Sequence, residues 1–108
     1  MKIVINRCFG GFGLSSEAHA LIAKRKGWQH ACDDYDHSYF ITGNSDYMYA
    51  CDLNRDDPDL IQCLETLGEA ANGNHSNLKI VEIPSDVDWM ICEYDGAEWI
   101  AERHRTWQ

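Results

Sequence analysis

The feature that most constrains the fold is the dipeptide Asp95-Gly96, because it joins two alternating segments near the end of the chain. Asp-Gly favours the left-handed backbone of a two-residue turn and is among the strongest short-range signals of a β-hairpin. We therefore predict a C-terminal hairpin of residues 86–94 and 97–107. The turn fixes the register, which places on one core-facing surface the pairs Tyr94 with Ala97, Cys92 with Trp99 and Met90 with Ala101.

The opposite face of this hairpin contains a conflict. The same register pairs Ile91 with Ile100 and places Glu93 directly across from Glu98. Two carboxylates at such a position repel each other unless water, a cation or a basic side chain lies between them. We expect this glutamate pair to be solvated or partnered.

The first part of the chain predicts a strand, a glycine loop and a helix. Residues 2–6 include three consecutive β-branched residues and are apolar on both faces, as in an interior strand. Ser15 or Ser16 is typical of a helix N-cap, and Gly27 of a helix end. Residues 28–54 show no sustained period, and we expect an irregular excursion there with one or two short strands.

The second part predicts another helix and three strands. Asp56 or Asp57 followed by Pro58 favours a helix start, and an apolar stripe continues toward Asn72-Gly73. Residues 78–83 alternate as a strand, and the hairpin follows. The fold class is therefore α/β in the broad sense, more narrowly α+β. We expect one two-layer domain over residues 1–108, with two main helices on a mixed sheet in the order β-α-α-β-β-β.

Charge and cysteine content exclude several functional classes. Eighteen acidic and nine basic residues give a net charge of −9, which disfavours direct binding of nucleic acid or of anionic membranes. Local cationic clusters at residues 24–26 and 103–105 leave room for an anion site. No apolar run reaches the length of a membrane span, and no signal peptide pattern follows Met1, so we expect a cytoplasmic protein.

The reactive residue types show no catalytic or metal-binding spacing. Five cysteines, an odd number without a CxxC pair, predict free thiols in a reducing compartment. The acidic segment 32–37 lacks the spacing of a zinc site or a calcium loop. The histidines are not grouped with a nucleophile in the sequence. We therefore expect no cofactor and no enzymatic activity.

The strongest candidate site is the glycine loop between the first strand and the first helix. Such a loop presents backbone N–H groups and the positive end of a helix dipole to an anion. It matches neither a Walker loop nor the dinucleotide fingerprint. An alternative is a tight connection in which both phenylalanines fill the core. The predicted ligand-binding residues in this segment are Arg7, Phe9, Gly10, Gly11, Phe12, Gly13 and Ser15.

The basic tail supplies the remaining candidates, Arg103, Arg105 and Trp107, which share one strand face. If the last strand lies near the first, these residues form a cationic pocket with Arg7. Alternatively, Trp107 covers the edge of the sheet and the arginines offset acidic neighbours.

Three segments carry a resemblance to a known group of proteins. Residues 1–15 (MKIVINRCFGGFGLS), 67–73 (LGEAANG) and 94–107 (YDGAEWIAERHRTW) resemble a family of small proteins of tailed bacteriophages and prophages. The resemblance covers the chain outside residues 28–54. It implies a setting in the cytoplasm of an infected bacterium and an accessory role in counter-defence, exercised by binding.

Two binding functions follow from this resemblance together with the residues. In the first, the protein sequesters a nucleotide immune signal, with amides and arginines on the phosphate and aromatic rings on the base. In the second, it is an acidic, anti-CRISPR-like inhibitor that occupies the nucleic-acid-binding surface of a host defence protein. An enzyme that degrades the signal is a third class. Glycine-loop sites in small domains often lie at subunit interfaces, so the sequence also allows a homo-oligomer.

Overall fold

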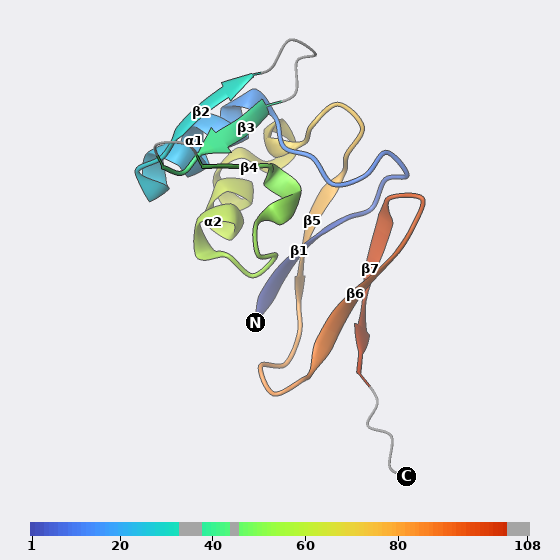
Figure 1. Cartoon of the computed structure of the whole chain (residues 1–108). Coiled ribbons are helices and arrows are strands. Elements are labelled where there is room, and N and C mark those ends of the chain that lie inside the picture. Colours follow the sequence, from blue (N-terminus) through green and yellow to red (C-terminus); the bar gives the residue numbers. More distant parts are fainter. Residues whose placement is uncertain (33–37, 44–45, 104–108) are drawn as a thin grey trace.

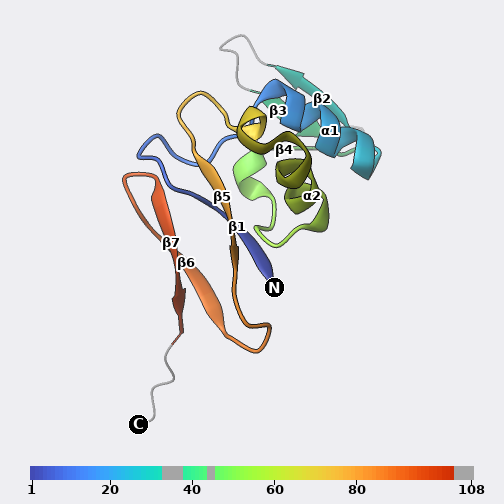
Figure 2. The ribbon, with the colours of Figure 1, turned by 180° about the vertical axis from the view of Figure 1, so that it is seen from behind.

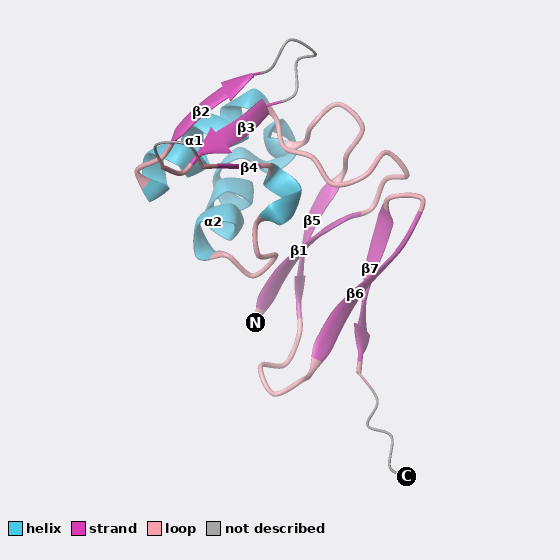
Figure 3. Ribbon diagram, viewed as in Figure 1, coloured by secondary structure: helices cyan, strands magenta, loops and turns pink. Residues whose placement is uncertain are grey.

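The computed structural model describes residues 1–32, 38–43 and 46–103, and it has the predicted α+β class (Figure 1). Two helices and several short strands alternate along the chain, coloured in Figure 3 by type. The elements in order are β1 (Lys2–Asn6), α1 (Ser16–Lys26), β2 (Gln29–Cys32), β3 (Ser38–Ile41), β4 (Tyr47–Met48), the 3-10 turn η1 (Ala50–Asp52), α2 (Pro58–Leu67), the 3-10 turn η2 (Gly68–Ala71), β5 (Leu78–Glu82), β6 (Trp89–Tyr94) and β7 (Ala97–Glu102).

The sheet arrangement differs from the expected single mixed sheet. The described strands form three separate antiparallel sheets, β1–β5, β2–β3–β4 and β6–β7. The segment expected to be an irregular excursion supplies one of them. Strand β7 runs beside β1, but the amide of Val4 donates to the carbonyl of Arg55 and that of Asn6 to the carboxylate of Glu98. These bonds occupy amides of β1 that a ladder to β7 would need.

Both helices begin and end largely as their capping residues predict. The hydroxyl of Ser15 accepts a hydrogen bond from the amide of Ala18 at 3.1 Å, and Gly27 closes α1 with a φ of 74°. Asp57 caps α2 and accepts from two amides of its first turn, with Pro58 in that turn. Helix α2 ends at Leu67, earlier than expected, and η2 continues the chain toward Asn72.

The core lies between the two helices and one face of β1. It includes Val4, Ile22, Phe40 and Leu60, all fully buried. Ile3 and Ile5 alternate with Val4 and are also buried, so they lie on the other face of β1, where the β6–β7 hairpin runs (Figure 1). Strand β1 is therefore interior, as its apolar residues on both faces predict.

The hairpin has the predicted register but the opposite orientation. All five predicted cross-strand pairs are present, and the turn residues Asp95 and Gly96 both have positive φ. The face predicted to lie on the core is instead exposed, including Tyr94 at 68% and Trp99 at 48%. The reason is Glu98, whose side chain is only 9% exposed and forms an ion pair with Arg55. Glu98 and Arg55 can meet only if the glutamate face turns inward.

Candidate functional site

The glycine loop, residues 7–14, lies between the hairpin turn and the loop that precedes β5. A Cβ on Gly10 would collide with the carbonyl of His75. A Cβ on Gly96 would lie 2.5 Å from the amide nitrogen of Gly11. Two of the glycines therefore have a structural role, because they allow backbone segments distant in sequence to touch.

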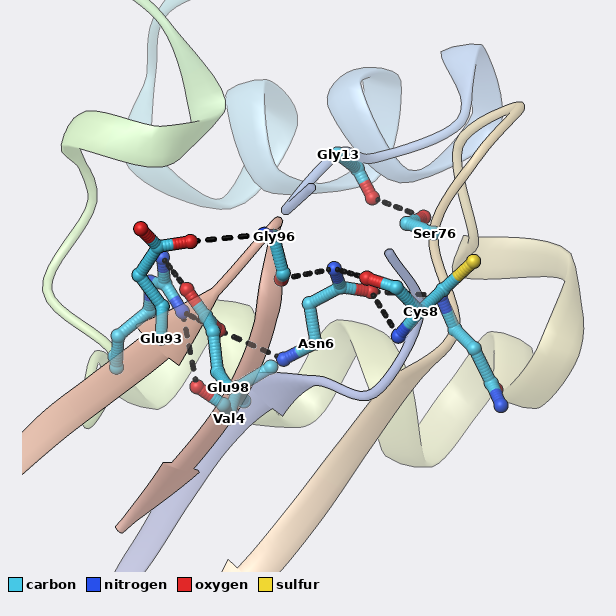
Figure 4. A network of polar contacts seen from close by, with 10 residues as sticks. Val4, Asn6, Cys8, Gly13, Ser76, Glu93, Gly96 and Glu98 are labelled. Atoms are coloured by element: carbon cyan, nitrogen blue, oxygen red, sulfur yellow. Dashed lines mark hydrogen bonds and ion pairs between the residues drawn. The ribbon is translucent and has the colours of Figure 1, made fainter. Parts of the chain in front are cut away.

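A buried asparagine fixes the start of this loop (Figure 4). Asn6 is fully buried, and its amide nitrogen Nδ2 donates to the carbonyls of Cys8 at 2.7 Å and Gly96 at 2.8 Å. Its oxygen Oδ1 accepts from the amides of Cys8 at 3.3 Å and Asn77 at 2.9 Å. One side chain thus connects the glycine loop, the hairpin turn and the segment before β5, and it leaves these three segments little freedom.

Arg55 is the second organiser of the site and was not predicted. Its guanidinium binds the Glu98 carboxylate in a bidentate manner, with N–O distances of 2.5 and 2.9 Å. It also lies 3.9 Å from the centroid of the Phe12 ring. This partner resolves the predicted repulsion of Glu98 and Glu93, while Glu93 accepts a hydrogen bond from the amide of Gly96 at 2.8 Å. The sequence gives no signal for Arg55, an isolated cation within the turn before α2.

The backbone amides of six consecutive residues, from Phe9 to Leu14, donate no hydrogen bond to any group of the described chain. At the start of α1, the amides of Ser16 and Glu17 are likewise unpaired among the described residues, as is usual at a helix N-terminus. The two groups are separated by Ser15, whose amide donates to the carbonyl of Ala71 at 2.9 Å. The amides of Ser16 and Glu17 lie at the positive end of the α1 dipole, and the loop amides precede them in the chain. Unpaired N–H groups in this arrangement can hold an anion.

A pocket of about 960 Å³ opens on this stretch. One wall is formed by residues 10–16 and another by residues 72–76. Tyr49, Ala50 and Cys51 line it from the region of η1, and His19 lines it from α1. Its size is in the range of small-molecule sites. No lysine or arginine is among the described residues of its wall, so backbone amides are the main groups available to hold a negative charge.

His19 provides a buried polar atom at the pocket. The residue is 2% exposed, and its Nδ1 lies 2.9 Å from the carbonyl oxygen of Ser15. A carbonyl only accepts, so Nδ1 carries the proton in the neutral ring and Nε2 remains an acceptor. Within the described chain this buried Nε2 has no partner. Burial lowers the pKa of His19, opposed in part by the bond to Ser15, so the ring is kept neutral.

Three tyrosines form an exposed aromatic cluster beside the pocket. The ring centroids of Tyr39, Tyr47 and Tyr49 are 5.9 to 6.3 Å apart in edge-to-face arrangements. Tyr49 belongs both to this cluster and to the pocket wall. The sequence contains the tyrosines, but only the pairing of β3 with β4 brings them together. This cluster was missed because residues 28–54 showed no clear period.

Most of the predicted glycine-loop residues line the pocket, but their side chains have different roles. Gly10, Gly11, Phe12 and Gly13 line the pocket together with Ser15. The hydroxyl of Ser15 is already occupied, because it donates to the carbonyl of Ala70 and accepts from the first turn of α1. Phe9 is 70% exposed and does not fill the core, whereas Phe12 is half-buried against Arg55, and the side chain of Arg7 is exposed.

The predicted cationic pocket with Arg7 does not include Arg103. Arg103 lies at the end of the hairpin remote from the Asp95-Gly96 turn, where its side chain is 3.6 Å from Asp88 and its amide donates to the Asp88 carbonyl. The glycine loop contacts the turn at the other end (Figure 2). Arg105 and Trp107 lie outside the described residues.

The other cationic cluster, at the end of α1, is used internally. Arg25 and Lys26 pair with Asp57 and Asp59 at the start of α2, at distances of 2.7 to 3.0 Å. Burial by itself lowers the pKa of Lys26, but the hydrogen bonds to the two aspartates raise it above its usual value. Two of the three residues at 24–26 therefore join the helices.

All five cysteines are free thiols, as predicted. Burial raises the pKa of Cys63 to about 11, which makes it an inert core residue. In the part of the chain that is described, no three His, Cys, Asp or Glu side chains gather where they could hold a metal ion. None of the described helices has the length and apolar character needed to cross a membrane. Comparisons with protein-family models, with curated proteins and with solved structures found no match for this chain.

Proposed function

We propose that this protein acts by binding, and that it sequesters a nucleotide-type small molecule in the glycine-loop pocket. The observation that carries the proposal is the run of amides from Phe9 to Leu14, which have no hydrogen-bond partner in the described chain and lie beside a pocket at the start of α1. Within this run Leu14 is buried and Gly11, Phe12 and Gly13 are half-buried, and N–H groups without partners are uncommon away from solvent. A bound anion would give them one.

The pocket and its surroundings offer a separate environment for each part of a nucleotide. A phosphate would lie against the loop amides and the positive end of α1. A base would stack on Tyr49, at the rim of the aromatic cluster, or on the exposed ring of Phe9. A sugar hydroxyl would donate to Nε2 of His19, once a small side-chain movement opens this buried atom to the pocket.

The charge of the site bears on the kind of ligand. Arg7 is the cation of the glycine loop, and its side chain is exposed. Glu17 in the first turn of α1 places a negative charge nearby. Backbone dipoles with one exposed arginine at the start of the loop suit a ligand of low charge, such as a cyclic nucleotide or an ADP-ribose derivative, better than a triphosphate.

The biological setting is part of the proposal. The resemblance to small proteins of tailed bacteriophages and prophages supports a role in the cytoplasm of an infected bacterium. There, removal of a nucleotide signal would blunt a host defence that depends on it.

A thermal-shift screen with cyclic dinucleotides, cyclic oligonucleotides and ADP-ribose derivatives tests this function. A ligand that binds only the folded chain raises the free energy of unfolding, by about 2.7 kcal/mol at a ligand concentration of 100 Kd, and the melting temperature rises with it. Arg7→Ala and Tyr49→Ala should weaken binding, while Lys24→Ala, an exposed cation in the last turn of α1, should not. If no ligand shifts the melting temperature, the proposed ligand-binding function is wrong. The alternative is then the acidic inhibitor, which should bind a basic host complex in a salt-sensitive manner.

A further inference from the structure

The outward face of the hairpin is apolar over its whole length. We call it the outer hairpin face, and it consists of Met90, Cys92, Tyr94, Ala97, Trp99 and Ala101. Met90 is 37% exposed, Trp99 48% and Tyr94 68%. An apolar face of this kind is typical of a sheet surface that packs against a core, and for that reason the sequence predicted it to be the core-facing side of the hairpin. The inner face, with Glu98, is already occupied by the contacts to Arg55 and Asn6.

The side chains of this face alternate in size in two directions. Each cross-strand pair combines one large and one small residue: Tyr94 with Ala97, Trp99 with Cys92, Met90 with Ala101. The large residue lies on β6, then on β7, then on β6 again. Rotation of a second copy by 180° about an axis parallel to the strands would place its β6 over β7 of the first. Every large side chain would then face a small one.

The charges at the end of the face follow the same symmetry. Asp88 and Arg103 flank the apolar pairs and lie opposite each other, with Arg103 Nε 3.6 Å from Asp88 Oδ1. Under the same rotation, Asp88 of one copy faces Arg103 of the other, and the reverse. The face is therefore complementary to itself in both shape and charge, as an isologous interface requires.

We propose that two copies of this chain form a twofold dimer through the outer hairpin face. A fully covered aromatic side chain buries about 150–250 Å². Tyr94 and Trp99 are 68% and 48% exposed and Met90 is 37% exposed, so the three side chains form the apolar centre of the contact and the residues around them complete a patch of roughly 800 Å² per partner. The net charge of −9 on each copy opposes association. At physiological ionic strength the Debye length is about 8 Å, which screens most of this repulsion. The dimer does not depend on the proposed ligand function, since the pocket lies beyond the turn of the hairpin.

Light scattering after size exclusion in 0.15 M salt tests the dimer. At tens of micromolar concentration, the molar mass measured for the full chain should be twice its monomer mass of 12.4 kDa. Trp99→Glu should give a monomer with an unchanged circular dichroism spectrum, because the side chain is half exposed. Tyr47→Glu, at an exposed tyrosine on β4, is the matched control and should leave the dimer intact. A wild-type monomer at all concentrations, or a Trp99→Glu dimer, would overturn the proposal.

A mixing experiment tests the twofold arrangement itself. Asp88→Arg leaves only positive charge at this end of the face, and Arg103→Asp leaves only negative charge, so each variant alone should dimerise at least 5-fold more weakly. Mixed in equal amounts, they should form a heterodimer in preference to either homodimer, as native mass spectrometry would show. Statistical mixing, or wild-type dimerisation of each variant alone, would contradict the proposed geometry.

Discussion

The ion pair of Arg55 with Glu98 predicts a large and specific loss of stability in Arg55→Ala. The pair is bidentate, and the two side chains are only 14% and 9% exposed. Removing one partner of a buried pair leaves the other charge uncompensated and costs about 3–5 kcal/mol. Glu98 retains its hydrogen bond from the amide of Asn6, so we expect the lower end, about 3 kcal/mol. At about 4–8 °C per kcal/mol for a domain of this size, the melting temperature should fall by roughly 12–24 °C.

A double-mutant cycle by urea unfolding measures the coupling between the two residues. Arg55→Ala and Glu98→Ala should each cost about 3 kcal/mol, and the double variant should cost at least about 1.5 kcal/mol less than their sum. Lys2→Ala serves as a control, because the pair of Lys2 with Glu65 is exposed and its loss should leave the midpoint nearly unchanged. Additive effects, or a loss in Arg55→Ala no larger than in Lys2→Ala, would refute the idea that this ion pair orients the hairpin.

Three further predictions concern the loop and its surroundings. Gly10→Ala should destabilise the protein strongly in thermal melts because its Cβ meets the His75 carbonyl, while Gly13→Ala has open space and should be tolerated; equal effects would contradict the close approach. Asn6→Ala should lower the free energy of unfolding in urea by at least about 2 kcal/mol, because the carbonyls and amides that Asn6 contacts lose their partners. Asn74 is exposed, so Asn74→Ala should change the same free energy by no more than about 0.5 kcal/mol. Burial lowers the pKa of His19 below 6.5, so the unfolded chain binds a proton that the folded chain does not, and stability should fall as the pH drops below about 6.5. His19→Gln should lose this part of the pH dependence in urea titrations at pH 5 to 7, and an unchanged slope would assign it to other groups.

Features set by neighbouring residues were predictable from the sequence. The register of the hairpin follows from Asp95-Gly96, and the two helix starts follow from Ser15 and from Asp57 with Pro58. Each depends on hydrogen bonds within a few residues, which the local residue types determine. The interior position of β1 was also correct, because three consecutive β-branched residues leave neither face polar.

Features set by distant contacts were not predictable. The orientation of the hairpin depends on an ion pair between residues 43 positions apart, and both of its faces contain apolar residues that suit a core. The separation of the β1–β5 sheet from the β6–β7 hairpin depends on the Glu98 carboxylate and the Arg55 carbonyl, which occupy amides of β1. The candidate pocket needed His19 and Tyr49, which no motif connects to the glycine loop.

An amide-resolved titration tests whether the glycine loop binds the ligand. The amides of Phe9 to Leu14 have no hydrogen-bond partner among the described residues. In proton–nitrogen correlation spectra of the free protein, these amides should exchange rapidly with solvent. Addition of the ligand that raises the melting temperature should shift these resonances and those of Ser16 and Glu17, and should slow their exchange. If the six amides are already protected in the free protein, or if the ligand shifts only resonances elsewhere, the glycine loop is not the binding site.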